Sequence, residues 1–293
     1  MNKSVIGVTI GDPGGIGPEI IEKALAQVRS KSKCTFRIIG TVGRCKPGSL
    51  TKASAQKALS ALNQSARLLQ SGKIQAVINA PISKANIHPL GFHYPGQTEF
   101  YASTFGLSHN EVTMMMTSPK LKVSLVSTHC SLRNAIQGIS KKTIHASLDR
   151  TLEVLIKMGI KQPRIAVAGL NPHAGENGMF GQEEKKMIRP ALQSWKSVKE
   201  VEVTGPHVPD VVFREAYQGK FDAVICMFHD QGLIPFKLVA FDSGVNLTLG
   251  LPVWRCSPDH GTAVDIAGQG IASPRSLISA CRLMEKLLST KHK

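Results

Sequence analysis

Short apolar runs alternate with longer amphipathic stretches in the first third of the chain. The runs at residues 5–10, 35–40 and 74–83 are rich in Val and Ile and predict strands. Between the second and third runs, apolar residues recur at helical spacing over residues 52–70, which predicts a helix. A strand, helix, strand order indicates parallel pairing in an α/β sheet. Ligands in such sheets gather at the carboxyl ends of the strands, so we expect functional side chains there.

The same alternation continues through the middle of the chain. The runs at 112–118 and 121–129 predict adjacent antiparallel strands, because Ser118, Pro119 and Lys120 are typical turn residues between them. Apolar residues at helical spacing over 144–158 predict a helix that ends at Gly159.

Three further elements are expected towards the end of this region. A run beginning at residue 164 predicts a strand that leads into a loop reaching residue 178. Pro206, Pro209 and Asp210 predict the start of a helix. The run beginning at Phe221 predicts a strand that leads to His229.

Two segments rich in glycine and proline interrupt the pattern. Residues 11–17 (GDPGGIG) follow the first strand and lead into a helix, with Pro18 in its first turn and Glu19 placed favourably against the helix dipole. These glycines match neither GxGxxG nor the Walker A sequence, so a ligand-binding loop and a turn without a ligand both remain open. Residues 88–96 predict a crossing between two domains.

Composition narrows the range of partners. The chain has 36 Lys and Arg against 20 Asp and Glu, a net charge of +16, which suits nucleic acid, an anionic membrane surface or small anions. The basic residues are dispersed and only 5% of residues are aromatic, so we expect no nucleic-acid groove. No signal peptide is visible and no apolar run reaches the roughly 18 residues of a membrane span, so no membrane association is expected. Six cysteines without a CxxC pair predict reduced, mostly buried thiols and a cytoplasmic location.

The window of residues 227–263 concentrates ionisable and amide side chains more than any other part of the chain. Glycines and prolines divide it, which excludes one long helix. The spacing from His229 to Lys237, Asn246 and Arg255 would let successive strand or loop ends bring a metal ligand, two cations and an amide towards one cleft. This arrangement predicts a polyanion site with a metal. The polar residues of the window are His229, Asp230, Gln231, Lys237, Asn246, Arg255, Asp259 and His260.

Three histidines follow predicted strands: His129, His173 and His229. Neutral imidazole binds divalent first-row metals, and three protein ligands with an open position make a catalytic site. Taken singly, each histidine fits a loop or core position equally well, and no HExxH sequence supports a site. The spacing therefore leaves a shared metal and three unrelated histidines both open.

A series of motifs runs along the chain: GDPGGIGPE, GxTEF, STHxxLR, GLNPHAGE, GPxxxD, HDQGLxPxK, GVNxTLGLPxxR and DHGTAxDIAG. In this order the motifs resemble the 4-hydroxythreonine-4-phosphate dehydrogenase family of vitamin B6 biosynthesis. The resemblance implies an isocitrate/isopropylmalate dehydrogenase-like α/β fold, with two α/β domains and the active site in the cleft and at the interface of a homodimer. With the predicted crossing, this gives a first domain of residues 1–93 plus 262–293, and a second of residues 94–261.

The resemblance also implies an activity. Members of the family oxidise 4-phosphooxy-L-threonine with NAD or NADP and a divalent metal, and the 2-amino-3-oxo-4-phosphooxybutanoate formed loses carbon dioxide to leave 3-amino-2-oxopropyl phosphate. Zinc, magnesium and cobalt all remain open as the metal, and the absence of a GxGxxG sequence does not count against a nicotinamide cofactor in this fold.

Carried over position by position, the resemblance assigns roles to individual residues. It implies that His129, His173 and His229 bind the metal. Asp210 is the candidate general base and Lys237 its rival. The residues implied in substrate binding are Gln97, Thr98, Lys237, Asn246 and Arg255. The candidate contacts to the nicotinamide cofactor are Gly11, Asp12, Gly14, Gly15, Asn171, Gly175 and Gly244.

Two features depart from the family pattern and keep alternatives open. Gln97 stands where the family has histidine, and an amide cannot carry a charge, so the substrate could instead be a related acid such as 4-phosphothreonate or 4-phosphoerythronate. The chain also lacks about a helix and a strand between Gly43 and Thr51. A third alternative is a non-catalytic basic protein that binds nucleic acid or anions, against which the intact histidines argue.

Overall fold

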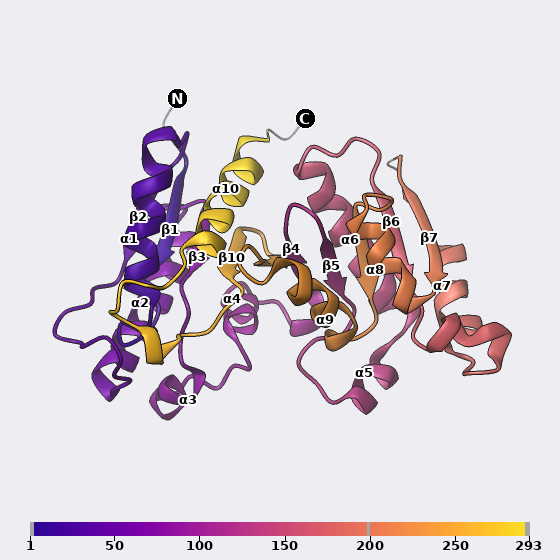
Figure 1. Ribbon diagram of the computed structural model, residues 1–293, viewed down its shortest axis with the longest axis horizontal. Coiled ribbons are helices and arrows are strands. Elements are labelled where there is room, and N and C mark those ends of the chain that lie inside the picture. The colour runs from indigo at the N-terminus through magenta and orange to yellow at the C-terminus, as the bar shows by residue number, and fades with distance from the viewer. Residues whose placement is uncertain (1–2, 198–199, 291–293) are drawn as a thin grey trace. The chain divides into compact units, whose positions relative to one another are not determined.

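The computed structural model describes residues 3–197 and 200–290. Within this part of the chain, two compact α/β units can be separated by their internal contacts (Figure 1). Unit 1 comprises Met1–His109 and Asp242–Lys293, and unit 2 comprises Asn110–Phe241. The chain therefore passes between units near residues 109 and 241.

These boundaries differ from the expected division at residues 93 and 261. The loop 88–96 lies within unit 1, because Phe92 is buried in the same apolar cluster as Ile87, Phe100 and Tyr101. Residues 242–261 also belong to unit 1, since the strand β10 pairs with β3 of that unit. Burial and strand pairing, which a turn-rich sequence does not reveal, decide where the units end.

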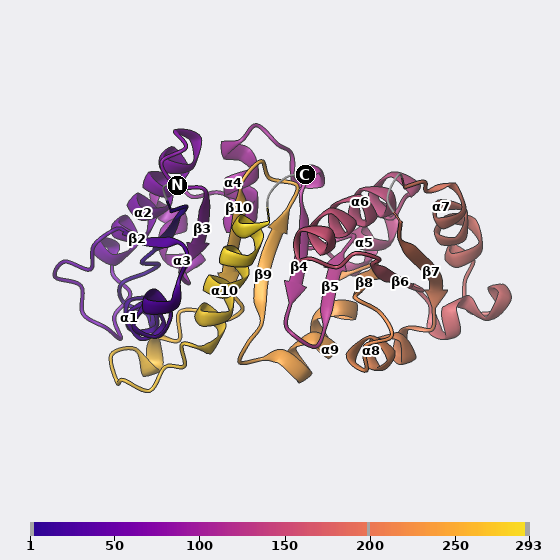
Figure 2. The same cartoon turned by 90° about the horizontal axis from the view of Figure 1, so that it is seen from above.

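The strands of unit 1 follow the order β2, β1, β3, β10, β9. β1 pairs in parallel with β2 and β3, β10 pairs in parallel with β3, and β9 is antiparallel to β10. Helices α1 and α10 contact each other on one face, and α2 covers the other face (Figure 2). The bounds are β1 (Val5–Thr9), α1 (Gly17–Val28), β2 (Thr35–Ile39), α2 (Lys52–Gln70), β3 (Ala76–Asn79), α3 (Lys84–Ile87), α4 (Gln97–Thr104), β9 (Val245–Leu249), β10 (Trp254–Pro258) and α10 (Arg275–Ser289).

Helix α2 confirms the prediction for residues 52–70. Thr51 caps its first turn, because the Thr51 side chain accepts a hydrogen bond from the Ser54 backbone N–H and the Ser54 hydroxyl accepts one from the Thr51 backbone N–H. The buried face of the helix packs against β1, β2 and β3. Apolar periodicity and a capping box, both local signals, are sufficient to set this helix.

The strands of unit 2 follow the order β4, β5, β8, β6, β7. β4 and β5 are antiparallel, as predicted, while β8 is parallel to β5 and β6, and β7 is parallel to β6. Helices α6 and α7 contact each other on one face of the sheet, and α8 and α9 pack on the opposite face (Figure 2). The bounds are β4 (Thr113–Thr117), β5 (Lys122–Leu125), α5 (Leu132–Gly138), α6 (Lys141–Lys157), β6 (Arg164–Ala168), α7 (Arg189–Ser194), β7 (Glu202–His207), α8 (Pro209–Tyr217), β8 (Ala223–Cys226) and α9 (His229–Ala240).

Two local predictions in unit 2 have opposite outcomes. The turn between β4 and β5 is confirmed, because the Ser118 hydroxyl accepts hydrogen bonds from the backbone N–H groups of Lys120 and Leu121. The assignment of Pro206 to a helix start is wrong, since Pro206 lies in β7 and α8 begins at Pro209. β7 has one neighbouring strand and mixed burial, so its sequence carries no apolar run that predicts a strand.

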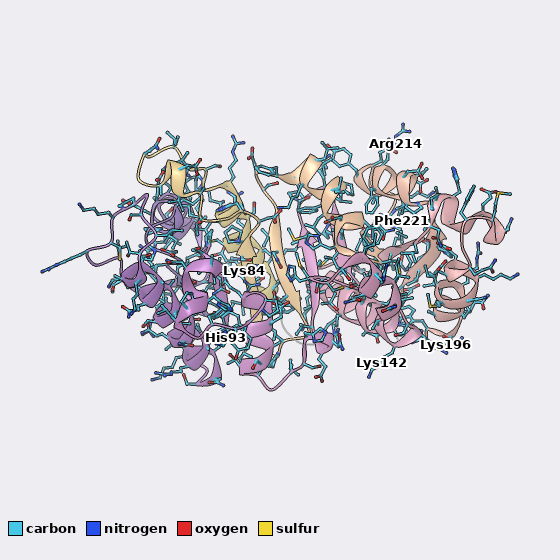
Figure 3. All side chains as sticks on the ribbon, turned by 90° about the horizontal axis from the view of Figure 1, so that it is seen from below. Lys84, His93, Lys142, Lys196, Arg214 and Phe221 are labelled. Carbon is cyan, nitrogen blue, oxygen red and sulfur yellow. The ribbon has the colours of Figure 1, made fainter. Side chains whose placement is uncertain are left out.

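The basic residues of unit 2 do not gather on one side. Figure 3 shows Arg214 of α8 on the opposite side of the unit from Lys142 of α6 and Lys196, which follows α7. Among the described residues, no helix has the length and apolar character needed to cross a membrane.

Candidate functional site

Arg255 is the largest fully buried side chain of the described residues and lies in β10 of unit 1. Its Nε donates a hydrogen bond to Asn79 Oδ1 at 2.8 Å. Its Nη1 donates to Thr98 Oγ1 and to Thr248 Oγ1, each at 3.2 Å. An amide oxygen and two hydroxyls thus hold a guanidinium that is only 2% exposed.

The pairing of β9 with β10 places the predicted residue Asn246 on the same sheet face as Arg255. Thr248 is directly opposite Arg255, and Asn246 is opposite Ser257, two positions further along. Because alternate residues of a strand share a face, Asn246, Thr248 and Arg255 project to the same side.

Two polar atoms among the predicted substrate residues are buried without a hydrogen-bond partner. These are Gln97 Oε1 in α4 and Asn246 Oδ1 in β9. An unsatisfied buried acceptor costs about 1–3 kcal/mol, so such atoms indicate a donor that the described part of the chain does not supply. A hydroxylated or amino-bearing ligand would provide that donor.

The electrostatics of this region favour an anion. Burial lowers the pKa of Arg255, while the charge of the Glu99 carboxylate acts in the opposite direction; a guanidinium stays protonated in proteins. Burial also raises the pKa of Tyr101, which therefore remains a neutral phenol. A buried cation whose hydrogen-bond acceptors are all neutral is stabilised by an anionic ligand.

Two of the three predicted metal ligands come together in unit 2. The ring centroids of His129 and His229 are 5.7 Å apart. His229 opens α9, and its Nδ1 is 2.6 Å from Asp230 Oδ1. A carboxylate at Nδ1 places the proton there and leaves the Nε2 lone pair for a metal. A cavity of 530 Å³ adjoins both rings and is lined by Thr128, His129, Cys130, Ser131, Leu132, Ala135, Phe228, His229 and Asp230.

His173 lies in a turn with an unusual backbone. Residues 173–177 all have positive φ, and four of them are not glycine: His173 (52°), Ala174 (50°), Glu176 (40°) and Asn177 (55°). The left-handed conformation costs an L-residue roughly 1–2 kcal/mol, so other contacts must hold this turn.

Glu184, in the following helical segment, holds the residues immediately before this turn. Its Oε1 accepts hydrogen bonds from the backbone N–H groups of Leu170 (2.7 Å) and Asn171 (2.8 Å), and its Oε2 accepts one from Asn171 Nδ2 (3.0 Å). Glu184 is 3% exposed. Burial raises its pKa, but the hydrogen bonds from Asn171 and Leu170 outweigh that effect and the pKa lies below its ordinary value. A Cβ at position 175 would approach Glu184 Oε2 to 2.6 Å, so glycine is required there.

The donor chemistry of His129 and His229 fits a divalent first-row metal, but the chain by itself does not assemble three ligands. Among residues 3–197 and 200–290, no three His, Cys, Asp or Glu side chains form a group that could hold one ion. The three-histidine site therefore stays a prediction, with two members adjacent and His173 on a separate turn.

The two candidate general bases lie on helices of unit 2. Asp210 is exposed in the first turn of α8, and Lys237 is partly buried in the last turn of α9. The idea that successive strand or loop ends carry the residues of the 227–263 window is wrong for Lys237, because His229 and Lys237 share one helix. Asn246 and Arg255 do lie in strands, β9 and β10.

The predicted cofactor residues have structural reasons within the chain. A Cβ at Gly11 would lie 2.3 Å from the Pro81 carbonyl oxygen, and one at Gly14 would lie 2.2 Å from that of Ser49. At Gly15 the obstacle is the Thr262 carbonyl oxygen, at 2.7 Å. The buried Asp12 accepts hydrogen bonds from Gly14 N–H and Asn86 Nδ2.

The Cβ direction of each of these three glycines therefore faces protein backbone. Gly244, also buried, accepts a hydrogen bond at its carbonyl from Ser276 Oγ at 2.6 Å. The cofactor contacts therefore stay a prediction.

Sequence reasoning did not identify Asn79, Tyr101, Thr248 or Glu184. A signal existed for Asn79, which is the single amide in the apolar run of β3. Thr248 is two positions from Asn246 in the same strand, which places it on the same face. Nothing in the sequence distinguishes Glu184 from its neighbour Glu183.

The sequence is similar to those of a known protein family. The family described as pyridoxal phosphate biosynthetic protein PdxA matches residues 16–284. The 4-hydroxythreonine-4-phosphate dehydrogenase of Desulfosudis oleivorans is 40% identical over 320 residues, covering 95% of this chain and 94% of that protein. The D-threonate 4-phosphate dehydrogenase of Pectobacterium atrosepticum is 36% identical, covering 97% and 99%.

Solved structures agree with these matches. The 4-hydroxythreonine-4-phosphate dehydrogenase of Klebsiella pneumoniae superposes with a TM-score of 0.79 at 33% identity, covering 97% of this chain and 99% of that one. The isocitrate dehydrogenase of Methylococcus capsulatus, at 14% identity and a TM-score of 0.57, shares the fold alone, with 98% and 86% covered. The expected isocitrate dehydrogenase-like fold is confirmed.

Proposed function

Because the chain belongs to the family of the pyridoxal phosphate biosynthetic protein PdxA, we propose that it is a nicotinamide-dependent dehydrogenase acting on 4-phosphooxy-L-threonine. A hydride leaves the carbon that bears the hydroxyl for NAD or NADP, and the hydroxyl proton passes to a base. The product is 2-amino-3-oxo-4-phosphooxybutanoate. Breaking the bond to its carboxylate then releases carbon dioxide, and protonation of the remaining carbon leaves 3-amino-2-oxopropyl phosphate.

The observation that carries the proposal is the environment of Arg255. A substrate with a phosphate and a carboxylate supplies an anion for a buried guanidinium whose hydrogen bonds to Asn79, Thr98 and Thr248 all go to neutral acceptors. The substrate's hydroxyl and amino groups supply donors for Gln97 Oε1 and Asn246 Oδ1. Thr98, which already contacts Arg255, and Lys237 complete the proposed substrate contacts.

The proposed metal ligands are His129, His173 and His229, with zinc, magnesium or cobalt as the ion. A bound divalent ion would make the substrate hydroxyl more acidic and stabilise negative charge on its oxygen. The Asp230 carboxylate would keep His229 in the tautomer that presents Nε2. Asp210 and Lys237 remain the two candidates for the base that accepts the hydroxyl proton.

The active form we propose is a homodimer. Helix α9, which begins at the metal ligand His229, exposes Ile234 (68%), Leu238 (85%) and Phe241 (65%) at i, i+4 and i+7 spacing. An apolar stripe of this kind is typical of a surface that another chain covers. A second chain would also offer a further metal ligand beside His129 and His229, the two histidines that are adjacent within one chain.

We also propose a cytoplasmic location. All six cysteines are free thiols, and Cys226, Cys256 and Cys281 are buried. Burial raises the pKa of Cys281 to about 12, so this thiol stays protonated and unreactive. Reduced, buried thiols of this kind suit a reducing compartment.

A second candidate substrate is D-threonate 4-phosphate, the acid named for several relatives. Gln97 supports this alternative, because a neutral amide stands where a histidine could carry a charge. The two acids differ at the substituent on carbon 2, which is an amino group in one and a hydroxyl in the other. Both keep the phosphate and the carboxylate.

The test is the formation of NADH or NADPH by purified protein with each acid and each cofactor, with zinc, magnesium or cobalt added. We expect turnover with 4-phosphooxy-L-threonine that stops when the metal is chelated. Turnover with D-threonate 4-phosphate alone would reassign the substrate. No turnover with either acid would overturn the proposed function.

A further inference from the structure

The guanidinium of Arg255 is oriented by a buried chain of hydrogen bonds that ends in a helix backbone. Arg255 Nε donates to Asn79 Oδ1, and Asn79 Nδ2 donates to the Tyr101 hydroxyl at 2.8 Å. The Tyr101 and Ser65 hydroxyls are 2.5 Å apart, and Ser65 Oγ donates to the Leu62 carbonyl at 2.7 Å. Because the Ser65 hydroxyl donates its proton to the Leu62 carbonyl, the Tyr101 hydroxyl donates to Ser65 and accepts from Asn79. The hydrogen bonds therefore all run in one direction, with each group donating to the next.

This direction determines which way the Asn79 amide faces. Its Nδ2 has two acceptors, the Tyr101 hydroxyl and Thr9 Oγ1 at 3.3 Å, so its Oδ1 must face Arg255. Asn79, Tyr101 and Ser65 are all 0% exposed, which leaves no water to compensate for a reversed amide. The hydrogen bonds of Arg255 with Asn79, Thr98 and Thr248 engage Nε and Nη1, so we take Nη2 as the atom that meets a ligand.

We propose that Asn79, backed by Tyr101 and Ser65, is a positioning residue that aims Arg255 at the anionic group of the substrate without neutralising its charge. The inference rests on the proposed function insofar as Arg255 is taken to bind the substrate. An aspartate at position 79 would accept the same hydrogen bond from Nε, but it would form a buried ion pair with the guanidinium. That pair would compete with the ligand's anion for the same charge.

The decisive variant is Asn79→Asp, which keeps the size of the side chain and the acceptor facing Arg255. We expect at least about tenfold weaker binding of 4-phosphooxy-L-threonine by calorimetry without cofactor. In turnover we expect KM to rise by a similar factor while kcat changes by less than about threefold, since binding of substrate and transition state falls equally. Asn79→Asp also replaces the Nδ2 donor to Tyr101 and Thr9 with an acceptor, so the melting temperature should fall. The readout that separates positioning from a merely structural role is the split between KM and kcat, because a structural defect would affect both kinetic constants.

The matched control is Asn63→Asp, the same change on the exposed face of α2 in the same unit. It adds the same charge without touching the chain of hydrogen bonds, so its affinity should match that of the wild type. A second variant, Tyr101→Phe, removes the hydroxyl behind Asn79 and adds no charge; we expect KM to rise by about threefold with kcat unchanged. Should Asn79→Asp not fold, Tyr101→Phe decides, and an unchanged KM would overturn the inference.

Direct binding keeps this test separate from the proposed function. If the wild type binds neither phosphorylated acid, the proposed function has failed, and inorganic phosphate serves as the anionic probe. The inference is supported if Asn79→Asp loses affinity for whichever of these anions the wild type binds. It is overturned if folded Asn79→Asp binds that anion as tightly as the wild type does.

Discussion

The anion site of unit 1 and the histidine site of unit 2 are built in different ways. Arg255 lies in a buried strand and is held by the hydrogen bonds that it donates to three other segments of the same unit. His129 and His173 are exposed and lie in loops, and His229 begins a helix. The proposed substrate contact is thus a buried residue held from several sides, whereas the proposed metal ligands are on surface segments that only further contacts can bring together. The difference predicts where each half of the chemistry is most easily broken.

The largest expected effect is the loss of metal on replacing a histidine. Losses of supporting groups already reduce metal affinity by 10–100-fold, so His129→Ala, His173→Ala or His229→Ala should each cost at least about tenfold and up to about a hundredfold. Equilibrium dialysis with zinc or cobalt measures the affinity, and turnover should fall with it. The informative case is His173, because it is not grouped with the other two in one chain. A His173→Ala protein with normal metal content and turnover would remove this residue from the site.

Arg255→Lys tests the rigid site with the charge retained. A lysine has one nitrogen and cannot satisfy Asn79 together with the two hydroxyls, so we expect a loss of about 2 kcal/mol in substrate binding, roughly thirtyfold. Isothermal titration with 4-phosphooxy-L-threonine measures this, and metal affinity serves as the internal control because it should not change. Equal losses of metal and substrate would mean that the two sites are not built independently.

Glu184→Gln tests the turn that carries His173. The amide places a donor against Asn171 Nδ2 or against the backbone N–H groups, so we expect the free energy of unfolding to fall by about 1.5 kcal/mol at pH 7. Glu183→Gln is the matched control, since Glu183 contacts only the Asn171 side chain among these groups. Chemical denaturation measures both variants.

The stabilising effect of Glu184 should also depend on pH. Its folded-state pKa lies below the ordinary value of 4.5, so the carboxylate stabilises the fold above about pH 4.5 and this contribution is lost as the pH falls through the folded-state pKa. The difference between wild type and Glu184→Gln should therefore shrink on acidification. A difference that stays constant down to pH 3 would show that the charge is not what holds the turn.

The smallest effect expected is at Gln97. Its Oε1 is buried without a partner, and a histidine there could donate a charge-assisted hydrogen bond to an anionic oxygen of the substrate. Gln97→His should strengthen binding of 4-phosphooxy-L-threonine by about 1 kcal/mol, about fivefold in KM, with turnover little changed. The gain should increase below about pH 6.5, where imidazole becomes charged. If the wild type already has the lower KM at both pH values, the amide is the better ligand.

The elements that the sequence predicts well are those with strong local signals. Helix α2 has an apolar stripe and a capping box, and it spans the expected residues. The β4 and β5 hairpin has two apolar runs around a serine and proline turn. By contrast, β7 and β10 contain polar residues and prolines in place of an apolar run, and they are strands because of the neighbours with which they pair. The domain boundaries differ from the expected ones for the same reason.

The residues of the site also divide into those that the sequence points out and those that only the structure reveals. Arg255 and Asn246 stand out in the sequence because their motif resembles that of a known family. The acceptors around Arg255 do not, since an asparagine in an apolar strand and a tyrosine in a helix have no visible relation along the chain. The sequence does not point to Glu184 either, because only the folded structure shows that its carboxylate accepts hydrogen bonds from two backbone N–H groups.

By itself, the sequence determined the class of fold, most helices and strands, and the types of residue available for an anion and a metal. Periodicity, caps and motifs act over a few residues, so they can be read without a structure. Only the tertiary structure decided that Arg255 is buried among neutral acceptors, that His129 and His229 are neighbours and that His173 is not grouped with them. The physical reason is distance along the chain: the hydrogen bond between Arg255 and Asn79 joins residues 176 positions apart, and such a contact exists only once the sheet has formed.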